Sequence, residues 1–173
     1  DRGFASAANR AYLTRGGGHY IHAEKLRHTN TEATAALARP GRYRTVADNL
    51  RVKEVHVAPG GTGDGDEGAR AVRFVVCHNP EQADRDAAVR ANLIGHLGHL
   101  IEGSDAWNPS RRSEFLGSLK DKPGLRRYLR RTKSGLLRID HAASKREAHL
   151  DGKWLIRTSD ATLNPDDLAA AYK

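Results

Sequence analysis

The pattern of apolar and polar positions predicts a succession of short strands. Residues 71–78 form the clearest one, because valine and phenylalanine make a nearly continuous apolar run there. Residues 43–47 and 50–58 mix β-branched with polar residues, as half-exposed strands do. The stretch 59–68 holds glycines and acids and no core residues, which predicts a hairpin loop. We therefore expect 50–58 and 71–78 to pair.

Two further strands are predicted at residues 20–26 and 136–139. The Asp-Gly pair at 151–152 separates residues 147–150 from residues 153–158. Asp-Gly between two such runs is a strong hairpin signal, so these runs are expected to form a second pair of strands.

Helical spacing and capping residues predict the helices. Residues 80–102 carry apolar residues at 89, 93, 97, 100 and 101, which share one helix face, and Asn79-Pro80 suits a helix start. At the end of the chain, Asn164 supplies a cap, followed by proline and two acids. The other predicted helices are residues 6–15, with Ser6 as the cap, a helical turn at 30–39, and two basic helices at 111–120 and 125–131.

The charge of the chain narrows the class of partner. The net charge is +8 and the pI is near 9.9, which favours a polyanion, with DNA or RNA ahead of an acidic membrane surface. A merely soluble basic protein has the same composition. The single cysteine, Cys77, cannot form an internal disulfide, and this is typical of a reducing cytoplasm. No apolar run approaches the ~18 residues of a membrane span.

Basic residues crowd one third of the chain. Phosphate contacts need positive charges and no particular order of them, so this stretch is a candidate DNA-backbone surface. At each single position, a solvated helix face is the simpler interpretation. The candidates are Arg126, Arg127, Arg130, Arg131 and Lys133, with Arg111, Arg112, Lys120 and Lys122 nearby.

A metal or redox site is an alternative that uses Cys77, His78, His96 and His99. The usual spacings of structural zinc sites are missing, because there is no Cys-x-x-Cys pair and no second cysteine. We expect instead that Cys77 is a buried strand residue and that His96 packs on a helix face.

Asp1 is a candidate for chemistry because an acid at a strand-to-helix turn is where α/β folds hold metals and phosphates. Taken alone, a turn or capping role is simpler. A wider pattern changes this interpretation. It consists of Asp1 to Ser6 with Asn9, residues 19–23, residues 77–80 with Arg85 and Asp86, residues 151–154 and 158–160, and Tyr172 with Lys173.

In the content and order of these segments, nearly the whole chain resembles DDE transposases of the insertion-sequence-four superfamily. The resemblance implies transposon-end cleavage and strand transfer on Mg²⁺ or Mn²⁺, held by three acids. Asp1 matches the second catalytic and metal-binding acid, Tyr172 the motif tyrosine, and Arg2 is a candidate for a phosphate contact. The first acid and the catalytic glutamate would lie outside these residues. We therefore expect an internal fragment, inactive alone, and the absence of methionine agrees.

The resemblance also implies the architecture and the partners. The expected fold class is α/β, a partial ribonuclease-H-like fold with a β-rich insertion domain. Residues 1–41 would be the core segment, residues 42–158 the insertion with its basic helices, and residues 159–173 the return to the core. The implied partners are transposon-end and target DNA and, in the full-length protein, a second copy in a homodimer. The implied location is the bacterial cytoplasm at the nucleoid, with no membrane.

A binding module is the alternative function. A basic domain of this kind would hold nucleic acid without performing chemistry on it.

Overall fold

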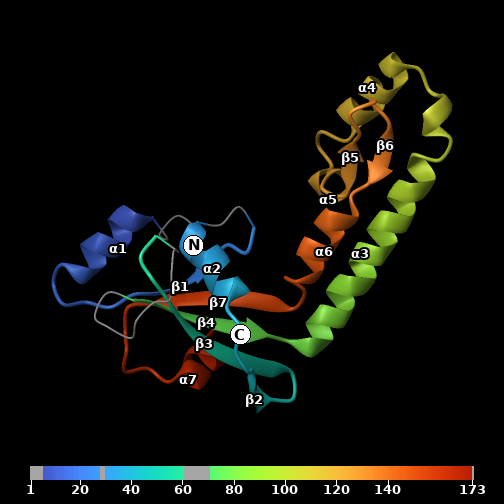
Figure 1. Cartoon of the computed structure of the whole chain (residues 1–173). Coiled ribbons are helices and arrows are strands. Elements are labelled where there is room, and N and C mark those ends of the chain that lie inside the picture. Colours follow the sequence, from blue (N-terminus) through green and yellow to red (C-terminus); the bar gives the residue numbers. More distant parts are fainter. Residues whose placement is uncertain (1–5, 28–29, 61–70, 173) are drawn as a thin grey trace. The chain divides into compact units, whose positions relative to one another are not determined.

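The computed structural model describes residues 6–27, 30–60 and 71–172 (Figure 1). The chain divides into two compact units. Asp1–Glu81 and Gly152–Lys173 make the first, which we call the sheet unit, and Gln82–Asp151 make the second, which we call the helix–hairpin unit. This is a division by packing. The domain limits expected at residues 41 and 158 stay predictions.

A five-stranded antiparallel sheet forms the centre of the sheet unit, with the strand order β1-β7-β4-β3-β2. The expected pairing of 50–58 with 71–78 is confirmed, since β3 and β4 pair along their whole length, with Val55 opposite Phe74. The fold is therefore mixed α and β. The strands are β1 (Ile21–Glu24), β2 (Arg44–Ala47), β3 (Leu50–Val57), β4 (Val72–His78) and β7 (Lys153–Thr158).

Helices cover both faces of this sheet. Helices α2 (Thr31–Ala38) and α7 (Pro165–Ala171) contact β3 and β4 from opposite sides (Figure 1). Both begin where predicted, because the side chains of Asn30 and Asn164 accept hydrogen bonds from the first turn. Burial on both faces explains why β4 is apolar at nearly every position.

Helix α1 (Ala7–Thr14) begins after Ser6, as predicted, with the Ser6 side chain accepting a hydrogen bond from Asn9 N. It buries none of its residues, and Tyr12 is 74% exposed. This helix therefore adds little to the core of the sheet unit.

The helix–hairpin unit is inserted between two neighbouring strands of the sheet. The chain leaves β4 at Asn79 and enters β7 after Gly152. The backbone N–H of Asn79 donates a 2.8 Å hydrogen bond to the carbonyl oxygen of Gly152. Gly152 has φ 62°, a conformation that favours glycine. The residues before this turn form helix α6 (His141–Ala148). The hairpin expected at 151–152 is therefore wrong, because Asp140 caps a helix there and β7 pairs with β4 and β1.

A small apolar core joins the elements of the helix–hairpin unit, built from Leu97, Leu119, Leu125 and Tyr128. The helix expected at 125–131 is wrong in its second half, where a strand begins and pairs across a turn. The remaining elements are α3 (Pro80–Leu100), the 3-10 helix η1 (Ser104–Ala106), α4 (Pro109–Ser118), α5 (Pro123–Arg126), β5 (Leu129–Arg131) and β6 (Leu137–Ile139).

The apolar face predicted on α3 is only half covered. Leu97 is fully buried, whereas Val89 is 58% exposed. His96 is also exposed, so the expectation that it packs on the helix face is wrong. Among the described helices, none combines the length and the apolar character needed to cross a membrane.

Candidate nucleic-acid interface

Asp1 and Arg2 lie outside the described residues, so their roles stay predictions. Tyr172 is described and stands at the C-terminal cap of α7. Its hydroxyl accepts a 3.0 Å hydrogen bond from the backbone N–H of Ala23 in β1. Since β1 is an edge strand, this contact ties the end of α7 to the strand that follows the Asp1 segment along the chain.

A buried ion-pair cluster lies where β1, β7 and α2 meet. One guanidinium nitrogen of Arg157 lies 2.6 Å from a carboxylate oxygen of Glu32 and 3.5 Å from one of Glu24. Arg157 also donates to the Tyr20 hydroxyl at 3.4 Å and stands over the Phe74 ring. Because this buried cation is surrounded by opposite charges and acceptors, it holds the sheet and the helix together.

Two pKa values in this cluster follow from its burial and charges. Burial lowers the pKa of His22, against the opposing effect of Glu24. Burial alone would raise the pKa of Glu32, but the N–H of Gly60 and the charge of Arg157 lower it below its ordinary value. Glu32 is therefore held as a carboxylate.

The described residues do not by themselves form a metal site. Within residues 6–27, 30–60 and 71–172, no group of three or more His, Cys, Asp or Glu side chains could hold an ion. Cys77, His78, His96 and His99 therefore do not gather into the metal site of the alternative interpretation. Cys77 is a buried strand residue, as expected, and burial raises the pKa of its thiol to about 12. Metal binding by Asp1 stays a prediction from the resemblance.

Two of the predicted DNA-contacting arginines have partners inside the protein. Arg127 lies 2.8 Å from Glu147, and Arg126 donates to the carbonyl oxygen of Leu116 at 3.1 Å. These bonds stabilise the junction of α4, α5 and α6. Both guanidinium groups are thus already engaged in the fold.

The other three predicted residues are Arg130, Arg131 and Lys133, on or beside the β5–β6 hairpin. All three are exposed, and their side chains form no hydrogen bond or ion pair with any described residue. The turn that joins the strands is ordered by Gly135, which has φ 83°, and by the hydroxyl of Thr132, which accepts from Leu136 N. The hairpin therefore presents free positive charge from a fixed backbone.

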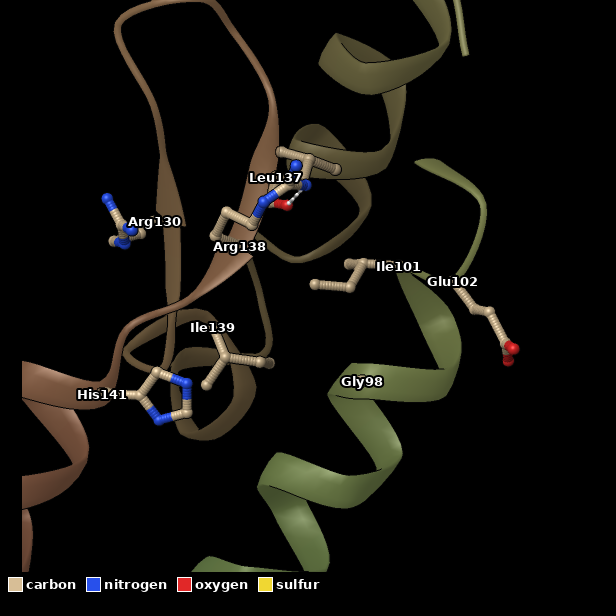
Figure 2. A pocket seen from close by; sticks show the side chains of 8 residues that line it. All are labelled: Gly98, Ile101, Glu102, Arg130, Leu137, Arg138, Ile139 and His141. Atoms are coloured by element: carbon tan, nitrogen blue, oxygen red, sulfur yellow. Dashed lines mark hydrogen bonds between the residues drawn. The ribbon is translucent and has the colours of Figure 1, made fainter. Parts of the chain in front are cut away.

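A pocket of about 520 Å³ opens beside this hairpin. Figure 2 shows Arg130, Arg138 and His141 on the hairpin side of it, and across from them Gly98 of α3 and Ile101, which directly follows that helix. The remaining lining residues are Glu102, Leu137 and Ile139. The pocket thus combines basic groups, all from the hairpin side, with apolar groups from both sides.

Asp105 fixes one of these basic groups. Both nitrogens at the tip of Arg138 bond to its carboxylate, at 2.6 and 2.8 Å. The hydrogen bonds from Arg138 lower the pKa of Asp105 below its ordinary value. Across the strand pair, Arg130 stands directly opposite Arg138 in the register. Two like charges thus face each other, and only one of them has a carboxylate against it.

Sequence reasoning missed Arg138, His141 and the ion pairs of Arg157. Arg138 alternates with Leu137 and Ile139, a strand pattern that could have placed it on the face opposite the core. Arg157 and Glu32 are 125 positions apart, and no local pattern links them.

No protein-family model, curated protein or solved structure matches this chain.

Proposed function

We propose that this chain is part of a DNA transposase that performs metal-dependent cleavage at transposon ends and strand transfer. The proposal takes its chemistry from the resemblance, in which Asp1 is the second catalytic acid and Tyr172 belongs to the motif around the third. Mg²⁺ or Mn²⁺ would bind at Asp1, together with acids that have no match among these residues. A ribonuclease-H-like core is the fold that this proposal implies.

The contact between Tyr172 and β1 is the observation that carries the proposal. Acids from distant parts of a chain can share a metal only if the fold brings their segments together. Here the helix that ends in the motif tyrosine reaches β1, the first strand after Asp1 along the chain, where the N–H of Ala23 donates a 3.0 Å hydrogen bond to the tyrosine hydroxyl. This arrangement supports a common site for the two ends of the motif.

The decisive experiment uses the transposase polypeptide that contains these residues. Mg²⁺-dependent nicking of transposon-end DNA should be lost in Asp1→Ala. Asp48→Ala is the matched control, because Asp48 is an exposed acid at the turn between β2 and β3 and should leave nicking unchanged. Nicking that survives Asp1→Ala would remove Asp1 from the catalytic residues and defeat the proposal.

A non-catalytic nucleic-acid-binding module is the second candidate. The observation that favours it is the free positive charge at Arg130, Arg131 and Lys133. Twelve Lys or Arg and three Asp or Glu stand between residues 111 and 146, so this region would attract any nucleic acid.

Both candidates predict the same effect of charge reversal, and Mg²⁺-dependent cleavage separates them. Replacing Arg126, Arg127, Arg130 and Arg131 with Glu should weaken DNA binding and flatten its salt dependence under either candidate. Only under the transposase candidate should the polypeptide that contains these residues also cleave transposon-end DNA with Mg²⁺. Unchanged binding in the charge-reversed protein would remove these four residues from the interface.

A further inference from the structure

We propose that the pocket beside the β5–β6 hairpin binds a backbone phosphate of a DNA strand, with Arg130 as its free cation. This inference rests on the proposed function, from which it takes DNA as the partner. It adds the site and two residues, Arg138 and His141, that the sequence did not single out.

The facing arginines are the first argument. Like charges directly opposite each other on an antiparallel strand pair are destabilising. Asp105 neutralises Arg138 with two hydrogen bonds, and it also fixes the direction of that guanidinium. Arg130 is left without a carboxylate among the described residues. A bound anion at Arg130 would remove the remaining repulsion, and a phosphate oxygen is the acceptor that a guanidinium bonds best.

The composition of the walls is the second argument. Arg130, Arg138 and His141 supply nitrogen donors on one side, and Ile101 and Leu137 supply apolar surface (Figure 2). A sugar–phosphate unit has the same two parts, an anionic group and an apolar ring edge. The volume of about 520 Å³ lies within the range of ligand pockets and admits one strand of backbone.

The surrounding charges agree with this choice. Glu102 is the only acid among the lining residues, and its side chain is 81% exposed, lies 3.8 Å from His99 and points away from the three basic groups (Figure 2). An acidic polypeptide is the competing occupant. We favour DNA because its charge density, about one charge per 1.7 Å of duplex, best matches the basic stretch from residue 111 to 146.

The test compares three variants of the 173-residue chain. Arg130→Ala removes the free cation of the pocket, and Arg130→Lys keeps the charge but not the forked donors. Arg146→Ala is the matched control, since Arg146 is an exposed arginine of α6 that does not line the pocket and makes no side-chain bond to a described residue. Each is titrated against a fluorescein-labelled 20-base-pair duplex between 50 and 200 mM NaCl, after circular dichroism has shown an unchanged fold.

We expect Arg130→Ala to weaken binding about tenfold and to reduce the slope of log K against log salt by about 0.9, the value for one phosphate contact. Arg130→Lys should recover the slope and part of the affinity, and Arg146→Ala should lose less than about twofold.

Three results would overturn the inference. If Arg130→Ala behaves like Arg146→Ala while the wild type binds DNA, the pocket is not the site, and the proposed function survives. If poly-glutamate displaces DNA from the wild type but not from Arg130→Ala, the pocket belongs to an acidic polypeptide. If the wild type binds no DNA at 50 mM NaCl, the inference fails at its DNA partner, and the nicking assay on the longer polypeptide decides the proposed function separately.

Discussion

A buried pair of arginines in the sheet unit contrasts with an exposed set of basic residues in the helix–hairpin unit. In the sheet unit, Arg157 and Arg73 are more than nine-tenths buried, and each bonds to carboxylates or carbonyl oxygens from other elements. In the helix–hairpin unit, Arg130, Arg131 and Lys133 are exposed and have no side-chain partner in the described structure. A net charge of +8 therefore hides two populations, one that stabilises the fold and one that is available to a partner.

The largest loss of stability is expected when a buried arginine of the sheet unit is replaced. Arg157→Met leaves Glu24 and Glu32 buried without their cation, which should cost about 3–5 kcal/mol of unfolding free energy. Arg130→Met should change stability by less than about 0.5 kcal/mol, because its side chain is solvated in the folded and unfolded states. Urea unfolding measures both. Equal losses in the two variants would show that the buried and the exposed arginine contribute alike to stability.

A second prediction concerns how the stability of the protein falls at low pH. The pKa of Glu32 is lower in the folded protein than its ordinary value of 4.5, so the unfolded chain binds a proton more readily. The stability contributed by Glu32 is therefore present above about pH 4.5 and is lost as the pH falls through the folded pKa.

The variant Glu32→Gln isolates this contribution. It should cost about 2 kcal/mol at pH 7, where a charged hydrogen bond to Arg157 is lost, and it should unfold with a shallower acid dependence below pH 5. Urea titrations from pH 7 to pH 3 provide the measurement. If the unfolding free energy of Glu32→Gln falls as steeply below pH 5 as that of the wild type, the charge of Glu32 is not stabilised by Arg157.

Arg127 is an intermediate case, because it belongs to the helix–hairpin unit but has a partner. Its side chain is one-third exposed and pairs with Glu147. Arg127→Met should cost about 1 kcal/mol, between the values for Arg157 and Arg130. Its effect on DNA binding should be smaller than that of Arg130→Ala in the same fluorescence titration. If Arg127→Met weakens DNA binding by more free energy than it costs in unfolding, Arg127 belongs with the exposed residues that are available to a partner.

The smallest effect is expected at the edge of the sheet. Tyr172→Phe removes the acceptor for the N–H of Ala23, and water can replace it because Ala23 is exposed, so the cost should be about 0.5 kcal/mol. Hydrogen exchange at Ala23 should nevertheless become faster, while the amides of β4 keep their protection. An unchanged exchange rate at Ala23 would mean that this contact does not hold the end of α7 on β1.

Local signals predicted much of the fold. The caps at Ser6 and Asn164 and the apolar run of β4 act within a few residues, and these elements form where they were expected. The errors fall where a distant partner decides. Residues 129–131 form a strand because residues 137–139 lie opposite them, and helical propensity alone does not reveal this.

The candidate site was less predictable for the same reason. A basic stretch is visible in the sequence, but which of its charges are free depends on where Glu147 and Leu116 lie in the fold. The pairing of β1 with β7 joins residues 137 positions apart at Ile21 and Thr158, and no local pattern in the sequence indicates it.

The hydrogen bond between Asn79 and Gly152 closes the base of one long insertion, Gln82–Asp151, between the adjacent strands β4 and β7. Such an insertion can be lengthened, shortened or replaced without altering the order of the strands in the sheet. An Asn-Gly turn in place of the part proposed to bind DNA would leave a continuous β4–β7 ladder.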